Sequence, residues 1–211
     1  MTADEQDALM ELFNIGIGRA ANSLSEMVND EVILSIPHIS VITRSHAVEM
    51  IVERASDHIT AIKQQFSGFF GGTALLVYPE SNSLELVRTL IGEDTPLETL
   101  TELEQESLLE VGNIILNACL GSFANMMELE LDFDLPEFFK GNCKSLLFDN
   151  HTLVDSLITS SPSESKLVFL ILDFMTKGGT KKDHKIKGFV MILLDSKALE
   201  DLREKLQRLL S

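Results

Sequence analysis

A repeat at fixed spacing constrains this chain more than any other feature of its sequence. Three elements of the N-terminal half return 99 positions later: Glu11 as Glu110, Asn14 as Asn113, and Pro37 as Pro136. A helix-start signal obeys the same shift, because Thr2 with Glu5, and Thr101 with Glu104, both have the spacing of a capping box. The repeat predicts a duplicated unit in which a helix precedes a strand that contains a proline.

The composition favours an acidic globular protein. With 211 residues, of which 45% are apolar, the chain can bury a substantial core. A net charge of −16 disfavours nucleic acid and anionic membranes as partners, because both need a positive field, and favours partners with a basic patch. The N-terminus lacks the pattern of a signal peptide, and no apolar run approaches the length that spans a bilayer. We expect a cytoplasmic monomer that binds neither nucleic acid nor membrane.

The two cysteines also favour a cytoplasmic location. Cys119 and Cys143 have no C-x-x-C spacing and form no paired framework. Such isolated thiols are typical of a reducing compartment, where they act as small buried hydrophobes. We expect no redox role for them.

Apolar periodicity and turn residues predict the order of the elements. In the first half we expect a long amphipathic helix at 3–29, a strand region at 31–44, a short helix at 46–54, a hairpin of strands 59–66 and 73–78, a helix at 83–91, and a linker at 92–96. In the second half we expect a helix at 102–128, a strand region at 129–135, a poorly patterned stretch to 160, strands at 166–175 and 186–194, and a helix at 196–209.

These elements predict one domain built from two halves. The fold class is α/β in the broad sense (α+β), with repeats at about 1–96 and 97–211 in a single domain that spans 1–211. We expect the two halves to join their sheets into one continuous sheet with internal pseudo-twofold symmetry, because each half exposes a sheet edge. The two long helices then carry the repeated Glu and Asn.

On each long helix the repeated pair lies opposite the apolar stripe. Residues three apart are neighbours on a helix, so Glu11 lies beside Asn14, and Glu110 beside Asn113. A solvated surface explains most single Glu-x-x-Asn pairs, but two copies at one offset favour a surface that faces a partner. The glycines Gly16, Gly18 and Gly121 are costly in helices, and close approach of a partner gives them a reason.

The spacing of these residues resembles a known family, the CheC, CheX and FliY phosphatases of bacterial chemotaxis. Its signature is Asp or Ser, three residues, Glu, two residues, Asn, twenty-two residues and Pro. The first half matches throughout, as Asp7, Glu11, Asn14 and Pro37, and the second half matches as Glu110, Asn113 and Pro136, with Glu106 in place of Asp or Ser. Two copies in a chain of this length resemble the CheC branch.

The resemblance implies a phosphatase for the phospho-aspartate of the chemotaxis response regulator CheY. It implies that Glu11 and Glu110 dock on the active-site lysine of the regulator, and that Asn14 and Asn113 hold the attacking water. The protein needs no cofactor of its own, and Mg²⁺ is expected on the response regulator.

Two alternatives stay open. The chain could be a non-catalytic chemotaxis or flagellar-switch adaptor that binds phospho-CheY or the receptor deamidase CheD, since the family fold also occurs in the flagellar switch protein FliM. An unrelated metal hydrolase is disfavoured, because the five histidines are scattered and no pair has ligand spacing on a helix.

Overall fold

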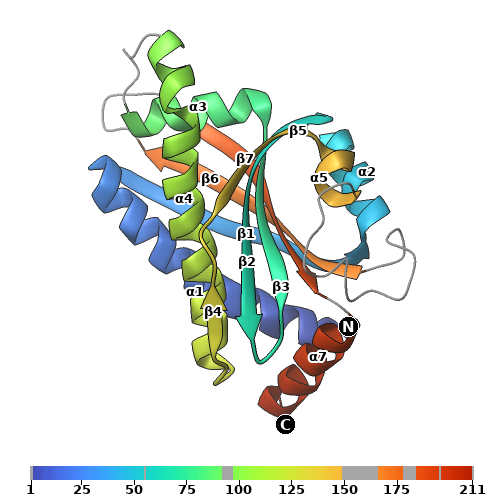
Figure 1. The fold of residues 1–211 in the computed structure, drawn as a ribbon. Coiled ribbons are helices and arrows are strands. Elements are labelled where there is room, and N and C mark those ends of the chain that lie inside the picture. The colour runs from blue at the N-terminus through green and yellow to red at the C-terminus, as the bar shows by residue number, and fades with distance from the viewer. Residues whose placement is uncertain are drawn as a thin grey trace.

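The computed structural model describes residues 2–54, 56–91, 97–148, 166–177, 184–194 and 196–210. It shows a mixed α+β fold with one antiparallel sheet and helices on both of its faces (Figure 1). The predicted linker at 92–96, residues 149–160 of the poorly patterned stretch and residues 178–183 between the last two strands lie outside the described residues.

Within the described residues, seven strands form the sheet, in the order β1-β6-β7-β3-β2-β4, with β5 also paired to β2. Their bounds are β1 (Glu31–Thr43), β2 (His58–Gly68), β3 (Gly72–Pro79), β4 (Leu131–Phe133), β5 (Glu137–Asn142), β6 (Lys166–Lys177) and β7 (His184–Leu194). The two predicted halves therefore share one continuous sheet, as expected. The prediction did not include an exchange of strands: β1 pairs with β6 of the second half, whereas β4 and β5 pair with β2 of the first.

The centre of the sheet is the pairing of β3 with β7. Leu75 lies opposite Met191, 116 positions later in the sequence. The same 116 positions separate Gly72 and Gly188, the glycines that begin two similar apolar segments at 72–77 and 188–193. Alternate side chains leave this centre toward opposite faces, since Leu76 joins the core under the long helices and Leu75 joins the core on the other face.

The helices divide between the two faces. One face carries α1 (Ala3–Val28), α3 (Glu80–Ile91), α4 (Leu97–Met126) and α7 (Ser196–Leu210), and the other carries α2 (Arg44–Arg54) and α5 (Cys143–Phe148). Figure 1 shows α1 and α4 crossing on the same face of the sheet, with α7 beside the start of α1. The long helices are thus supported from below by the sheet and exposed on their outer sides.

The first long helix begins as predicted. Thr2 Oγ1 accepts a hydrogen bond from the Glu5 N–H at 3.2 Å, and Glu5 Oε2 accepts one from the Thr2 N–H at 2.9 Å, which completes the capping box. The apolar stripe of this helix is buried from Leu9 to Leu24, but Met27, which continues the same helical spacing, is 44% exposed. Val28, the last residue of α1, is again partly buried against the core.

The prediction of a second capping box, at Thr101 and Glu104, is wrong. Helix α4 begins at Leu97, four residues before Thr101, so Thr101 lies inside the helix. Glu104 is buried and accepts hydrogen bonds from Ser83 Oγ at 2.7 Å and Lys140 Nζ at 3.0 Å. Burial opposes the charge of Lys140, but its bonds to Glu104 and Glu80 outweigh burial and raise its pKa. Glu104 therefore braces α4 against α3 and β5 instead of capping a helix.

The expectation that no apolar run approaches the length of a membrane span is also wrong. Residues Leu103–Met126 of α4 are long and apolar enough to cross a bilayer by length and composition. In the fold, 56% of the apolar window is buried, because α4 packs on α1 and the sheet. Burial of a core helix accounts for this apolar composition.

Both cysteines are buried and free, as the sequence predicted. Burial raises the pKa of Cys119 and of Cys143 to about 12. Burial thus disfavours the thiolate form of both cysteines.

Candidate functional site

The crossing of the two long helices fixes which of their faces stay open. A Cβ on Gly16 would lie 2.5 Å from the Ala118 carbonyl oxygen and 2.8 Å from Cys119 Cα. Gly16 is therefore required for the approach of α4 and not for a partner, which corrects the role expected for it. Around Gly18 and Gly121 the space is open, so these two glycines lie on accessible faces of the helices.

The first predicted pair lies on the exposed face of α1. Glu11 and Asn14 are both solvent-exposed. Asn14 Oδ1 accepts a hydrogen bond from the backbone N–H of Ile36 at 3.2 Å. This bond links the helix to the strand residue that directly precedes Pro37.

The proline explains why the Ile36 N–H is available. Pro37 has no N–H to donate to the neighbouring strand, and the β1–β6 register shifts between Ser35 and His38. β1 is also the edge strand of the sheet, where a bulge is tolerated. The sequence pattern of Asn, twenty-two residues and Pro therefore corresponds to a physical contact between α1 and the bulge in β1.

The second pair is held differently. Asn113 Oδ1 accepts a hydrogen bond from Asn117 Nδ2 at 2.7 Å, and Asn117 Oδ1 accepts one from Gln64 Nε2 at 3.1 Å. Gln64 Nε2 also donates to the carbonyl oxygen of Asp134 at 3.0 Å, two residues before Pro136. The helix and the segment before the proline are again linked, but here through two intervening side chains.

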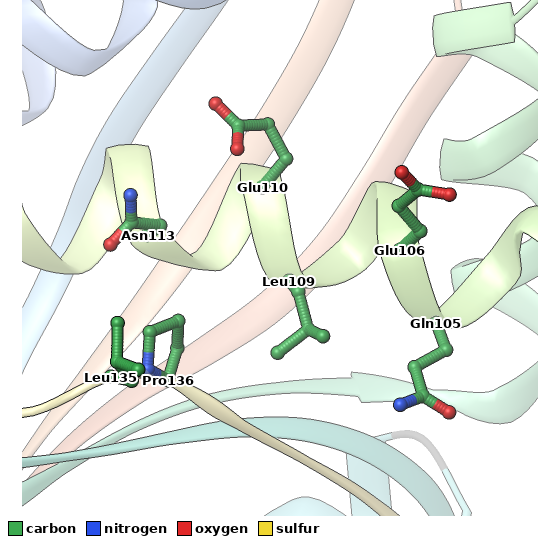
Figure 2. A pocket seen from close by; sticks show the side chains of 7 residues that line it. All are labelled: Gln105, Glu106, Leu109, Glu110, Asn113, Leu135 and Pro136. Carbon is green, nitrogen blue, oxygen red and sulfur yellow. The ribbon is translucent and has the colours of Figure 1, made fainter.

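The orientation of each asparagine amide follows from these partners. A backbone N–H is only a donor, so the bond from Ile36 identifies the side-chain oxygen of Asn14. A backbone carbonyl is only an acceptor, so the bond to Asp134 identifies the side-chain nitrogen of Gln64 and thereby the direction of the hydrogen bonds that lead to Asn113. Both asparagines therefore use their oxygen inside the protein. Figure 2 shows the Asn113 nitrogen on the same side of α4 as the Glu110 carboxylate and away from Pro136.

An open groove of about 530 Å³ borders the second pair. It is lined by Gln105, Glu106, Leu109, Glu110, Asn113, Leu135 and Pro136 (Figure 2). Leu135 is 88% exposed, whereas Ile36, the residue 99 positions earlier, is 3% exposed. The difference arises because β4 ends at Phe133 and β5 begins at Glu137, which leaves Leu135 outside both strands.

The carboxylates of the two pairs are available to a partner. Among the described residues, neither Glu11 nor Glu110 has an ion-pair partner, and both are exposed. Glu106, the departure from the signature, is exposed and lines the groove beside Glu110. Within the same part of the chain, no group of three or more His, Cys, Asp or Glu side chains could hold a metal ion.

Sequence reasoning missed the role of Gln64. It lies on β2 between Ile62 and Phe66, which both point into the core under the long helices, and it is 2% exposed. A polar residue at an inward position of an apolar strand is a signal that could have identified it, since a buried amide requires partners. No role was predicted for Asn117, which lies four residues after Asn113 on the same helix.

Two exposed helix faces, each with a glutamate and an oriented asparagine, lie above one antiparallel sheet. Residues 5–41, which contain the whole first copy of the signature, match the CheC-like family. The resemblance inferred from the sequence is thus confirmed.

The chain is similar to two curated relatives from Bacillus subtilis (strain 168). It is 26% identical over 137 residues to the CheY-P phosphatase CheC, which covers 64% of this chain and 65% of the relative. It is 27% identical over 134 residues to the flagellar motor switch phosphatase FliY, which covers 63% of this chain and 34% of the relative. The chain thus matches less than two thirds of the length of each relative.

Solved structures show the same fold over nearly the whole chain. The crystal structure of Thermotoga maritima FliY matches with a TM-score of 0.72 at 16% identity, and covers 99% of this chain and 98% of that one. The FliM middle domain from H. pylori matches with a TM-score of 0.61 at 11% identity, and covers 97% and 99%. At these identities the likeness concerns the fold alone.

Proposed function

We propose that this protein is a phosphatase that accelerates hydrolysis of the phospho-aspartate of a CheY-like response regulator. The observation that carries the proposal is the orientation of Asn14 and Asn113. Each amide oxygen is bonded within the protein, so that the amide N–H groups remain for an external acceptor, one helical turn from an exposed glutamate. The similarity to the phosphatases CheC and FliY supports the same activity.

In this proposal Glu11 and Glu110 dock the regulator. An exposed carboxylate without an internal partner can pair with the active-site lysine expected on the regulator, in a charge-assisted hydrogen bond. The i, i+3 spacing places the asparagine next to the docked lysine. The open space at Gly18 and Gly121 lets the regulator approach the helices closely.

The asparagines then orient the attacking water. A water that accepts a hydrogen bond from the amide N–H keeps a second lone pair for the phosphorus. Attack forms the bond from the water oxygen to phosphorus and breaks the bond to the aspartate oxygen, which releases inorganic phosphate and the aspartate carboxylate. An acyl phosphate is already activated, so positioning supplies most of the remaining catalysis. Mg²⁺, expected on the regulator, would offset the phosphoryl charge.

We also propose that the two halves, at about 1–96 and 97–211, are related by a pseudo-twofold axis through the centre of the sheet. The strand order supports this, because it reads the same from both ends when each strand is exchanged for its counterpart in the other half. Leu75 pairs with Met191, its counterpart at the 116-residue offset, as an axis at that point requires. The axis relates the two Glu/Asn pairs as two catalytic sites of one cytoplasmic monomer.

A non-catalytic adaptor is the second candidate. The shared fold with the FliM middle domain favours it, and the net charge of −16 suits a partner with a basic patch. The candidate partners of such an adaptor are CheD and the phosphorylated regulator. An adaptor, however, has no need of two amides held with their N–H groups free. The oriented asparagines therefore favour the enzyme.

The decay of a phosphorylated CheY-like regulator distinguishes the two candidates. The proposal expects decay to accelerate with added protein until the regulator is saturated. A titration that shows binding of the phosphorylated regulator but no acceleration at saturation would contradict the phosphatase and favour the adaptor. Decay of the regulator alone in the same Mg²⁺ buffer provides the baseline.

A further inference from the structure

The two asparagines of the proposed function are oriented by unequal means. Asn14 is held by a backbone N–H of β1, which cannot rotate away while the strand is intact. Asn113 is held by the side chain of Asn117, which is itself held by the side chain of Gln64. An amide can turn over about its last torsion, so a side-chain partner orients Asn113 only if it is itself fixed.

Gln64 provides that fixed point. It is 2% exposed, and its Nε2 bonds both Asn117 and the Asp134 carbonyl oxygen. The Asp134 N–H in turn donates to the Gln65 carbonyl oxygen at 3.0 Å, so this segment is tied to β2 from both sides. A carbonyl accepts but never donates. The Asp134 carbonyl therefore determines the donor-to-acceptor direction of the hydrogen bonds from Gln64 to Asn117 and from Asn117 to Asn113.

We propose that Gln64 and Asn117 are positioning residues of the second site and that the first site has no equivalent. They hold the Asn113 amide with its oxygen inward, and thus present its N–H groups to the water. The residue 99 positions before Asn117 is Gly18, which has no side chain to take this role. The inference rests on the proposed function and deepens it, because it makes one of the two sites dependent on a buried side chain.

The test uses variants in which one site works alone. Asn14→Ala leaves the second site, and Asn113→Ala leaves the first. Gln64→Met keeps the length of the side chain and removes its donor. With the second site alone, we expect Gln64→Met to lower kcat about 10- to 100-fold with KM within about twofold, because orientation and not docking is lost. With the first site alone, we expect kcat to stay within about twofold.

A second substitution at Gln64 tests the direction of its hydrogen bond to Asn117 separately from the size of its side chain. Gln64→Glu keeps the size of the side chain but presents an acceptor to Asn117, whether it is ionised or donates a proton to Asp134. Asn117 then donates to residue 64 and turns its oxygen toward Asn113, which reverses the Asn113 amide. We expect the second site to lose activity as in Gln64→Met, although residue 64 keeps a hydrogen bond to Asn117.

Asn117→Ala covers the case in which a change at buried Gln64 prevents folding. Asn117 is only half-buried on α4, and alanine is favourable in a helix. The same selective loss at the second site is expected.

Three results would overturn the proposal. Equal loss in both backgrounds would mean that Gln64 and Asn117 act only on the stability of the sheet. Unchanged kcat at the second site would mean that Asn113 does not need Gln64 and Asn117 to orient it, although the phosphatase proposal would still hold. If neither background accelerates decay before Gln64 is changed, the phosphatase proposal itself fails, and the positioning role fails with it.

Discussion

Asn14 Oδ1 accepts a hydrogen bond at 3.2 Å from the backbone N–H of Ile36, the residue before Pro37. This contact explains why an asparagine and a proline recur at one spacing in the sequence. The proline removes a donor from the ladder and bulges the edge strand, and the freed N–H next to it orients the asparagine. The proline is thus linked to the helix by structure and not only by sequence.

Pro37→Ala tests this link. Alanine supplies an N–H that allows β1 to pair regularly with β6, which draws the Ile36 N–H away from Asn14. In the Asn113→Ala background we expect kcat to fall roughly tenfold, or about 1.4 kcal/mol in barrier height. Pro136→Ala is the control, since it lies in the inactive half of that variant. Unchanged turnover in Pro37→Ala, measured by regulator decay, would show that Asn14 does not depend on the bulge.

A pair of glycine substitutions compares a packed position of α1 with an open one. Gly16→Ala places a methyl group against the backbone of Ala118 and should destabilise the fold by about 1–3 kcal/mol. Gly18→Ala enters open space within a helix and should stabilise it by about 0.5–1 kcal/mol. Urea unfolding of the two variants measures both changes. Similar stability of the two would contradict the close crossing of α1 and α4 at Gly16.

Leu135 provides a test of docking at the second site. With 88% of it exposed beside Glu110, its side chain is available to an apolar contact of the regulator. In the Asn14→Ala background, Leu135→Ser should raise KM about fivefold, equivalent to ~1 kcal/mol, and leave kcat unchanged. Val52→Ser is the matched control, because Val52 is 42% exposed on α2, on the opposite face of the sheet. Equal effects of the two changes would remove Leu135 from the docking surface.

Acid weakens the attachment of α7 through Glu5. The hydrogen bond from Gln207 at 2.8 Å, then the Thr2 N–H, lower the pKa of Glu5 below its ordinary value of 4.5. The charged form is favoured by folding, so its stabilisation is present above pH 4.5 and is lost as the pH falls through the lowered pKa. Glu5→Gln should therefore reduce the free energy of unfolding at pH 7, and the difference from wild type should shrink below pH 4.

Urea midpoints of wild type and Glu5→Gln at neutral and acidic pH measure this dependence. Asp7→Asn, an exposed change on the same helix, controls at pH 7 for loss of a carboxylate from the first turns. A difference between wild type and Glu5→Gln that grows as the pH falls would contradict the role given to Glu5.

The sequence predicted the long elements well because their patterns are local. Helix α1 and the hairpin of β2 and β3 follow from periodicity, a capping box and a glycine turn, all of which act within a few residues. β5 was missed, because Glu137–Asn142 lacks a clear alternation of apolar and polar residues. The exchange of β1 and β5 between halves was also missed, since strand pairing over such separations leaves no local signal.

The sequence predicted only those features of the site that depend on local helical spacing. Glu11 and Glu110 are exposed as the helical period requires, but the period alone could not decide that Gly16 faces α4. Gln64 and Asn113 are 49 positions apart and are linked by hydrogen bonds through Asn117. Only the fold brings these side chains together.

The most direct test of the account is the decay of a phosphorylated CheY-like regulator with the Asn14→Ala/Asn113→Ala double variant. If both amides orient the water and both glutamates dock the regulator, turnover should fall to the rate of the regulator alone, while the Kd for the phosphorylated regulator stays within about threefold. Each single variant should keep the activity of its intact site. A double variant that retains the wild-type rate would contradict the assignment of Asn14 and Asn113 as the catalytic residues.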